Sequence, residues 1–208
     1  MPYEEGGWRS NLQKRYYVLA GKIALPLVKA GISPNHITVV GMLLSFVSGM
    51  LFATGSIFLG GFVLWLSAIM DPIDGTVARL SGKVSRFGAL FDSTLDRYSE
   101  FFVFFGLMIY FNSGWMLIVV MLALMGSIMV SYVKARAEGL GQKEVRGLMQ
   151  RPERIILLLT GAILNTPINS VFFPGCADCT LKWTIVILAV LTNITALQRL
   201  ITSHRELA

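Results

Sequence analysis

Residues 71–96 read DPIDGTVARLSGKVSRFGALFDSTLD, which sets four aspartates at the ends of two apolar stretches. A charge inside a bilayer is costly unless it is paired or bound to metal, so carboxylates placed there usually serve a function. Asp71 and Asp74 are three residues apart, and Asp92 and Asp96 are four apart, so each pair would share one face of a helix. A short turn between the helices would bring the two faces together. A hard divalent cation with oxygen ligands would then relieve the repulsion among the carboxylates.

A purely structural role and a role in ion transport each explain these aspartates less well than a metal-binding site of an enzyme does. Salt bridges to Arg79, Arg86 and Arg97 for folding alone would leave an excess of negative charge at one level of the membrane. A cation transporter would use the same carboxylates as an ion site, but such carriers typically show internal repeats or interrupted helices in matching halves. Both aspartate pairs fall instead in one consecutive pair of helices. An enzyme that binds a divalent metal accounts for the pattern best.

Composition places the chain in a bilayer. Its 208 residues are 54% hydrophobic and only 14% charged, whereas a soluble domain carries about 25% charged residues. A membrane-spanning helix needs roughly 20 apolar residues. The candidate stretches, of which the second and fifth need their polar flanks to reach this length, are 36–55, 56–70, 87–111, 115–133, 155–168 and 183–201. The sequence therefore predicts an all-α integral membrane protein with six transmembrane helices.

Basic residues are distributed unevenly among the predicted connections. They precede the first span, follow the second, fourth and sixth, and leave only Lys182 in a connection of the other parity. The positive-inside rule then predicts a multi-pass protein of the cytoplasmic membrane with both termini in the cytoplasm. The net charge of +6 matches loops beside anionic lipid, and no nucleic-acid partner is expected.

Two segments outside the spans carry weaker signals. Residues 11–31 mix apolar and basic side chains at helical spacing, which predicts an amphipathic helix at the membrane interface. Lys22 and Lys29 make a seventh span costly. Cys176 and Cys179 have no second cysteine pair and no histidine nearby, so a zinc site is not expected. A loop disulfide and two free thiols both fit this pair.

The aspartate stretch resembles a known family signature. Its order is D-x-x-D-G-x-x-A-R-x8-G-x3-D-x3-D, complete here at Asp71, Asp74, Gly75, Ala78, Arg79, Gly88, Asp92 and Asp96. This many fixed positions make the resemblance to the CDP-alcohol phosphotransferases very specific. The resemblance extends over nearly the whole chain and implies one membrane domain over residues 1–208, with residues 71–96 as its catalytic signature. It also implies a homodimer.

The resemblance implies a role for each signature residue. Asp71, Asp74 and Asp92 would hold one or two divalent metals, Mg²⁺ or Mn²⁺, which would bridge the diphosphate of a CDP-linked lipid. Asp96 would be a further ligand, or the general base that takes the proton from the acceptor hydroxyl. The implied contacts to the CDP-lipid are Ser33, Pro34, Asn35, His36, Gly75, Arg79 and Ser85.

A second group of cationic residues lies at predicted cytoplasmic helix ends and suits a phosphate on the acceptor. Its members are Lys134, Arg136, Arg151, Arg154 and Arg199. Basic residues at such ends also satisfy the positive-inside rule and the helix dipole without any ligand.

Three segments, SYVKARAE, RPER and QRL, resemble the branch of the family that makes phosphatidylinositol phosphate. That branch takes CDP-diacylglycerol as donor and inositol 1-phosphate as acceptor. The positions that hold the acceptor's phosphate there are matched by Ser131, Lys134, Arg136, Arg154 and Arg199. Synthesis of phosphatidylglycerol phosphate from glycerol 3-phosphate is the alternative, because a phosphate-binding cluster does not distinguish inositol from glycerol. Glu100 either supports the site or pairs with Arg97.

Overall fold

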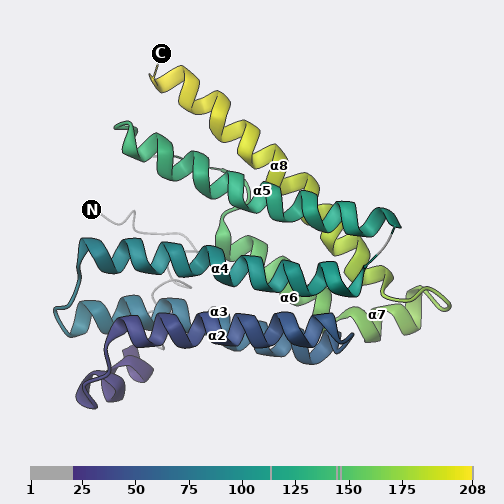
Figure 1. Cartoon of the computed structure of the whole chain (residues 1–208), viewed down its shortest axis with the longest axis horizontal. Coiled ribbons are helices and arrows are strands. Elements are labelled where there is room, and N and C mark those ends of the chain that lie inside the picture. Colours follow the sequence, from purple (N-terminus) through teal and green to yellow (C-terminus); the bar gives the residue numbers. More distant parts are fainter. Residues whose placement is uncertain (1–20, 113, 144, 146, 208) are drawn as a thin grey trace, which may run out of the picture. The chain divides into compact units, whose positions relative to one another are not determined.

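The computed structural model describes residues 21–112, 114–143, 145 and 147–207, and every regular element in these ranges is a helix. In chain order (Figure 1) the helices are α2 (Pro34–Ala53), α3 (Ile57–Leu80), α4 (Arg86–Tyr110), α5 (Gly114–Gly139), α6 (Arg151–Ile163), α7 (Asn165–Phe172) and α8 (Cys179–Leu207). Residues 21–29 form a further helical segment. The all-α prediction is confirmed for this part of the chain.

Four helices have the length and composition of membrane spans, namely α2, α3, α5 and α8. Helices α6 and α7 meet at a bend of 56° and pass the same test together, as one broken span or a re-entrant segment. Helix α4 is not among these spans because ionisable side chains such as Asp92, Arg97 and Glu100 lower its hydropathy. The described residues therefore contain four to five candidate spans, and the sixth stays a prediction.

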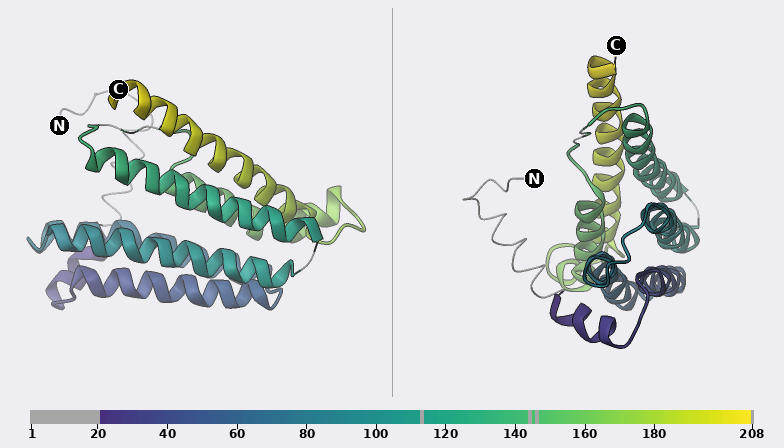
Figure 2. Two further views of the ribbon diagram at one scale, coloured as in Figure 1. Left: turned by 45° about the horizontal axis from the view of Figure 1, so that its top comes forward. Right: turned by 90° about the vertical axis from the view of Figure 1, so that its left-hand side faces the viewer.

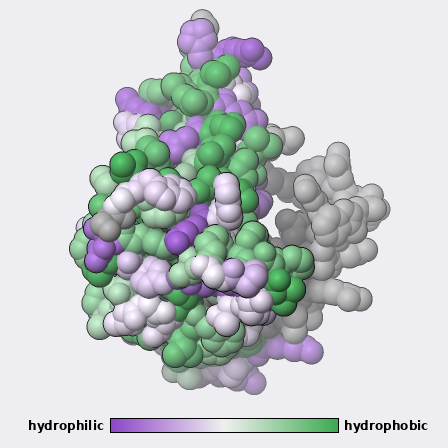
Figure 3. Space-filling view, turned by 90° about the vertical axis from the view of Figure 1, so that its right-hand side faces the viewer, coloured by the Kyte–Doolittle hydropathy of each residue, from purple (hydrophilic) through white to green (hydrophobic). Residues whose placement is uncertain are grey.

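Large apolar side chains lie exposed along the candidate spans. Ile118 and Met121 on α5 are 60% and 55% exposed, and Leu197 on α8 is 60% exposed. Figure 3 shows apolar residues, in green, at the surface over much of the face that it presents. Soluble monomers rarely expose so much contiguous apolar surface. Lipid is the solvent that suits these helices, and the chain is a multi-pass membrane protein.

Contacts divide the chain into two compact units. The first unit comprises the described residues up to Leu44 together with Leu66–Ser99. Ser67 on α3 donates a 2.8 Å hydrogen bond to the backbone carbonyl of Gly41 on α2, which ties the two helices together within this unit. Its buried apolar core contains Ala24, Ile37, Ile73 and Val77. A single domain over residues 1–208 stays a prediction.

The second unit comprises the described residues of Ser45–Trp65 and Glu100–Ala208. Helix α5 runs beside α8, as Figures 1 and 2 both show, and α6 also contacts α8. A Cβ added at Gly126 on α5 would overlap the buried side chain of Thr192 on α8. Small residues at a helix interface allow this close approach, which replaces the hydrophobic effect as a source of association inside lipid.

The connection between α7 and α8 is held by covalent and polar contacts. Cys176 and Cys179 form a disulfide, which decides between the two alternatives that fitted the sequence. Asp178 lies between them, and its carboxylate accepts hydrogen bonds from the Tyr110 hydroxyl and the Asn165 side-chain amide. These contacts fix the connection against α4 and α7 within the second unit.

Only part of the predicted interfacial helix falls in the described ranges. Residues 11–20 lie outside them, whereas residues 21–29 are helical. Ala24 is fully buried, and Ile23 and Leu25 are about half exposed. An amphipathic interfacial helix over residues 11–31 stays a prediction.

Candidate active site

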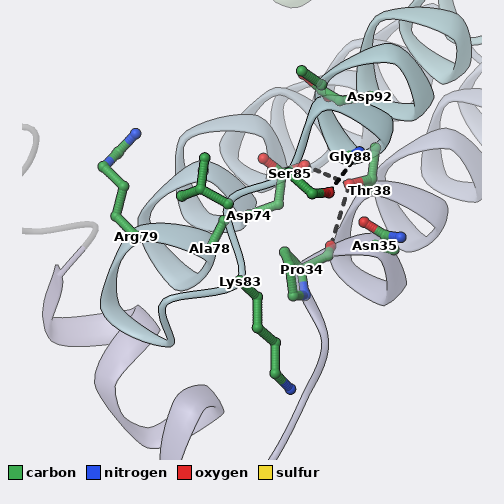
Figure 4. A pocket seen from close by; sticks show the side chains of 13 residues that line it. Pro34, Asn35, Thr38, Asp74, Ala78, Arg79, Lys83, Ser85, Gly88 and Asp92 are labelled. Atoms are coloured by element: carbon green, nitrogen blue, oxygen red, sulfur yellow. Dashed lines mark hydrogen bonds between the residues drawn. The ribbon is translucent and has the colours of Figure 1, made fainter.

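A pocket of about 330 Å³ lies in the first unit, where the start of α2, the end of α3 and the start of α4 meet (Figure 4). Its lining residues are Pro34, Asn35, Thr38, Asp74, Gly75, Ala78, Arg79, Lys83, Val84, Ser85, Gly88, Ala89 and Asp92. The pocket thus brings together two of the signature aspartates and five of the residues predicted to contact a CDP-lipid. Of the residues predicted to bind the CDP-lipid or the metal, Ser33, His36, Asp71 and Asp96 fall outside this lining.

Asp74 is held in place by a residue from another helix. The hydroxyl of Thr38 donates a 2.8 Å hydrogen bond to Oδ2 of Asp74, and both residues are buried. Pro34 is the first residue of α2, a position where its missing N–H costs nothing. Thr38 follows one turn later, with its hydroxyl 3.2 Å from the Pro34 carbonyl oxygen. The start of α2 therefore positions the hydroxyl that orients Asp74.

Asp92 reaches the same pocket from α4. Ser85 precedes the first residue of that helix, and its Oγ accepts a 2.9 Å hydrogen bond from the backbone N–H of Gly88. This is the geometry of an N-terminal cap, which satisfies an otherwise unpaired helix donor. A Cβ at Gly88 would lie 3.0 Å from the Ser85 Oγ. Glycine at this position therefore keeps the pocket wall open beside the cap.

Arg79 lies against the last turns of α3. Its Nη2 donates a 3.1 Å hydrogen bond to Oγ1 of Thr76. A Cβ at Gly75 would lie 3.4 Å from Nη1 of Arg79, so glycine leaves room for the guanidinium group over the helix surface. Arg79 and Lys83 give the pocket two cationic side chains beside its carboxylates. This mixture suits a ligand that carries phosphate groups and arrives with a divalent cation.

The carboxylates provide oxygen donors for such a cation. The negative charges of Asp92 and Asp71 both act on Asp74, in that order of strength. Among the described residues, no three or more His, Cys, Asp or Glu side chains are already arranged to hold a metal. Like charges repel in a medium of low dielectric constant, and a cation with oxygen ligands would offset that repulsion. The donor set fits a hard divalent cation, and the four-aspartate site stays a prediction.

Asp96 has a neighbour of its own on α4. Its Oδ2 lies 3.5 Å from Nη2 of Arg97. One turn further along, Glu100 belongs to the second unit and accepts a 2.5 Å hydrogen bond from Nη2 of Arg154. The structure therefore shows Arg154 as an ion-pair partner of Glu100, a contact that the sequence did not indicate.

The cationic residues predicted to hold the acceptor's phosphate lie in the second unit. Arg154 is 4% exposed, and its Nη2 also lies 3.5 Å from the Ser131 hydroxyl. Arg199 is 3% exposed and donates a 2.5 Å hydrogen bond to the backbone carbonyl of Val130. Ser131 and Val130 are adjacent on α5, so the two buried guanidinium groups approach the same turn of that helix. Their positive charges act on one another.

The other predicted acceptor residues lie nearer the surface. Lys134 is exposed and forms a 3.8 Å ion pair with Glu138 on the same helix. Arg136 lines a separate, largely apolar groove between the ends of α5 and α8, together with His204. Arg151 is partly buried at the start of α6. The structure thus brings Ser131, Arg154 and Arg199 close to one turn of α5 and places Lys134, Arg136 and Arg151 elsewhere along the helix ends.

Four lining residues of the pocket were missing from the sequence-based site, namely Thr38, Lys83, Val84 and Ala89. Glu100, whose role the sequence left undecided, pairs with Arg154. The position of Thr38 one turn after the Pro-Asn start of a helix was an available signal. Lys83 lies in the short link between the two aspartate helices, which was another.

Comparisons with known proteins place the chain in a family. Residues 31–195 match the model of the family described as CDP-alcohol phosphatidyltransferase. The phosphatidylinositol phosphate synthase of Mycobacteroides abscessus is 40% identical over 152 residues, which cover 71% of this chain and 69% of that protein. The archaetidylinositol phosphate synthase of Pyrococcus horikoshii is 33% identical over 187 residues, which cover 89% of this chain and 91% of that protein.

Solved structures agree with the sequence relatives. The phosphatidylinositol phosphate synthase of Mycobacterium tuberculosis with CDP-DAG bound matches with a TM-score of 0.78 at 35% identity, covering 88% of this chain and 92% of that chain. A crystal structure of the same enzyme in complex with manganese and citrate has the same TM-score and identity, and the match covers 88% of each chain.

Proposed function

We propose that this chain, which belongs to the CDP-alcohol phosphatidyltransferase family, transfers the phosphatidyl group of CDP-diacylglycerol to inositol 1-phosphate and releases CMP. The family resemblance of the aspartate signature is confirmed, and the relatives named phosphatidylinositol phosphate synthase support the reaction. The observation in this chain that carries the proposal is the pocket of the first unit. There Asp74 and Asp92 share one lining with the cationic side chains of Arg79 and Lys83.

The pocket residues are proposed to bind the donor through its nucleotide and diphosphate. Arg79 and Lys83 supply positive charge for phosphate oxygens, and the hydrogen bond to Thr76 restricts the orientation of the Arg79 fork. Asn35 and Ser85 provide polar groups in the same lining. Ser33 and His36 flank Pro34 and Asn35 in the chain and stay part of the proposal.

Asp71, Asp74 and Asp92 are proposed to hold a divalent cation, Mg²⁺ or Mn²⁺. When bound, such a cation supplies positive charge that offsets the diphosphate and stabilises the departing CMP. The hydrogen bond from Thr38 to Oδ2 of Asp74 orients that carboxylate from outside the ligand set. The relative solved with manganese supports a divalent ion and does not decide between magnesium and manganese.

Asp96 is proposed as the general base. Its carboxylate accepts the proton of the acceptor hydroxyl while the hydroxyl oxygen attacks the phosphorus atom of the phosphatidyl group. The bond from that phosphorus to the CMP oxygen breaks, and CMP leaves with both electrons of the bond. Asp96 follows Asp92 by one turn of α4, so the same helix would carry a metal ligand and the base.

The acceptor's phosphate is proposed to bind the buried arginines of the second unit. Arg154 and Arg199 are both buried, and the Nε atom of each has no hydrogen-bond partner among the described residues. Buried donors without partners are costly, and a phosphate monoester would satisfy them by charge-assisted hydrogen bonds. Ser131 completes this group, while the remaining predicted contacts add positive charge nearer the surface: Lys134, Arg136 and Arg151.

A second candidate donor follows from one relative. The archaetidylinositol phosphate synthase of Pyrococcus horikoshii covers nearly the whole chain. A CDP-linked ether lipid would present the same diphosphate to the pocket aspartates, because the lipid backbone lies beyond the reacting phosphorus. Donor selectivity is therefore tested with both lipids.

We also propose the architecture that the sequence predicts in finer detail. It has six transmembrane helices in one domain, an interfacial helix over residues 11–31, and both termini in the cytoplasm. It forms a homodimer in the cytoplasmic membrane. Support comes from the candidate spans and from the uneven distribution of basic residues.

The proposal is tested by CMP release from purified protein in lipid nanodiscs. Inositol 1-phosphate and Mg²⁺ are supplied with either CDP-diacylglycerol or its ether-lipid counterpart. We expect CMP to form with one of these donors, to stop on chelation and to resume when Mg²⁺ or Mn²⁺ is restored. Asp92→Asn should bind lipid but form no CMP. Equal CMP release in the presence of a chelator would contradict the proposed metal site.

A further inference from the structure

Glu100 and Arg154 form an ion pair that is almost completely removed from solvent. Nη2 of Arg154 lies 2.5 Å from Oε1 of Glu100, and the two residues are 4% and 7% exposed. The pair joins α4 to α6 within the second unit. Arg97, the other partner that the sequence offered for Glu100, lies 3.5 Å from Asp96.

A second buried guanidinium group, that of Arg199, adds positive charge beside this ion pair. Arg199 is also buried, and the positive charge of Arg154 acts on it. Among the described residues, Glu138 and Glu153 also act on Arg199, but both are exposed, so Glu100 is the carboxylate buried in direct contact with Arg154. Two buried cations against this carboxylate leave an excess of positive charge, which is expensive in a medium of low dielectric constant.

The hydrogen bonds around Arg154 show how Glu100 fixes the position of its side chain. Nη2 is directed to Glu100 and lies at longer range from the Ser131 hydroxyl, whereas the buried Nε has no partner in the part of the chain that the structure describes. Arg199 is similar: its Nη1 donates to the Val130 carbonyl, and its Nε meets no acceptor within the described ranges. Each arginine is therefore fixed through one end and keeps an unsatisfied donor for a ligand.

We propose that Glu100 is a positioning residue for the phosphate monoester that the two arginines bind. It fixes Arg154 and offsets part of the buried positive charge, so that phosphate binds reversibly. The identity of the ligand as the acceptor rests on the proposed function. Binding of inorganic phosphate to the arginine pair does not depend on the proposed function. A failure of the proposed function and a failure of this inference can therefore be distinguished.

Two substitutions separate position from charge. Glu100→Gln keeps the size of the side chain and an oxygen that can accept from Arg154, but it removes the offsetting charge. Glu100→Ala removes both. Glu206→Gln is the matched control, because it makes the same charge change at an exposed residue of α8, where solvent screens the effect.

The first measurement is the rise in melting temperature of the full-length protein in detergent as inorganic phosphate is added. A ligand that binds only the folded state raises the melting temperature, so this rise reports phosphate binding. Wild type should be stabilised by phosphate. Glu100→Gln should need a phosphate concentration lower by about fivefold or more, because a nearby negative charge no longer opposes the ligand. Glu206→Gln should match wild type. No stabilisation of wild type, or a weaker response in Glu100→Gln, would overturn the inference.

The second measurement uses turnover with inositol 1-phosphate. Glu100→Ala should raise the KM for that acceptor by about tenfold or more, since a misplaced arginine loses a charge-assisted hydrogen bond. The KM for the CDP-lipid should stay within about twofold of wild type, and Glu100→Asp should recover part of the loss. A fall in kcat and melting temperature with unchanged acceptor KM would show a merely structural residue. Wild type that is stabilised by phosphate but inactive with inositol 1-phosphate would sink the proposed function and leave this inference standing.

Discussion

Thr38 on α2 donates a 2.8 Å hydrogen bond to Asp74 on α3, and the two side chains are 8% and 7% exposed. The bond links the start of α2 to the aspartate signature inside the first unit. It restricts the orientation of the Asp74 carboxylate. A residue outside the signature therefore sets the orientation of a residue inside it.

Thr38→Val tests that relationship directly. Valine keeps the shape of threonine but removes the hydroxyl, so a buried carboxylate oxygen loses its partner. We expect kcat/KM to fall by about tenfold and the metal concentration for half-maximal activity to rise. Thr38→Ser should retain most of the activity. If Thr38→Val matches wild type in both quantities, the hydroxyl does not orient Asp74.

Arg79→Lys tests donor binding. Lysine keeps the charge, but it cannot reproduce the guanidinium fork or the 3.1 Å hydrogen bond to Thr76. We expect the KM for the CDP-lipid to rise by about tenfold, with the acceptor KM within about twofold of wild type. Arg86→Lys is the control, because Arg86 is exposed at the start of α4 and lies outside the pocket lining. A rise confined to the acceptor KM would move Arg79 out of the donor site.

Much of the pocket could be predicted from residues 71–96, because aspartates at fixed helical spacing stand out in an apolar sequence. Their spacing pointed to Asp74 and Asp92, the family resemblance implied Gly75, Arg79 and Ser85, and all five line the pocket. Thr38 did not, because its place one turn after the Pro-Asn helix start does not reveal that its hydroxyl meets Asp74 on another helix. Helical periodicity shows which face a residue occupies, but not which residue of another helix it meets.

For the cationic cluster, the sequence identified the residues but not which of them are buried. Its basic residues were grouped because they lie at predicted cytoplasmic helix ends. The positive-inside rule alone would also place basic residues there, without any ligand. Burial separates them: Arg154 and Arg199 are almost fully enclosed, while Lys134 and Arg136 are exposed. Glu100 was left undecided for the same reason, because its partner Arg154 is distant in the sequence.

Arg199→Lys tests the acceptor cluster. The substitution keeps one positive charge and removes the Nε donor and the fork that reaches Val130. We expect the KM for inositol 1-phosphate to rise by about tenfold while the KM for the CDP-lipid changes little. Steady-state kinetics with each substrate varied in turn measures both values. An unchanged acceptor KM would place the phosphate elsewhere.

Gly106→Ala tests helix packing in the second unit at a residue with no proposed contact to substrate. A Cβ at Gly106 on α4 would overlap the backbone of Gly49 on α2, and backbone cannot move as cheaply as a side chain. We expect a loss of about 1–3 kcal/mol of stability, seen as a lower melting temperature in detergent. Gly139→Ala is the control, since nothing lies within 4 Å of a Cβ there. Equal melting temperatures for the two variants would contradict the close approach of α2 and α4.

The most direct test of the proposed reaction is product formation from CDP-diacylglycerol and Mg²⁺ with three acceptors in parallel: inositol 1-phosphate, glycerol 3-phosphate and free inositol. CMP and the lipid product are both measured by mass spectrometry. The arginine cluster predicts turnover with inositol 1-phosphate and none with free inositol, because only the former carries the phosphate that the buried guanidinium groups bind. Efficient turnover with free inositol, or with glycerol 3-phosphate alone, would contradict the assignment of this chain as a synthase of phosphatidylinositol phosphate.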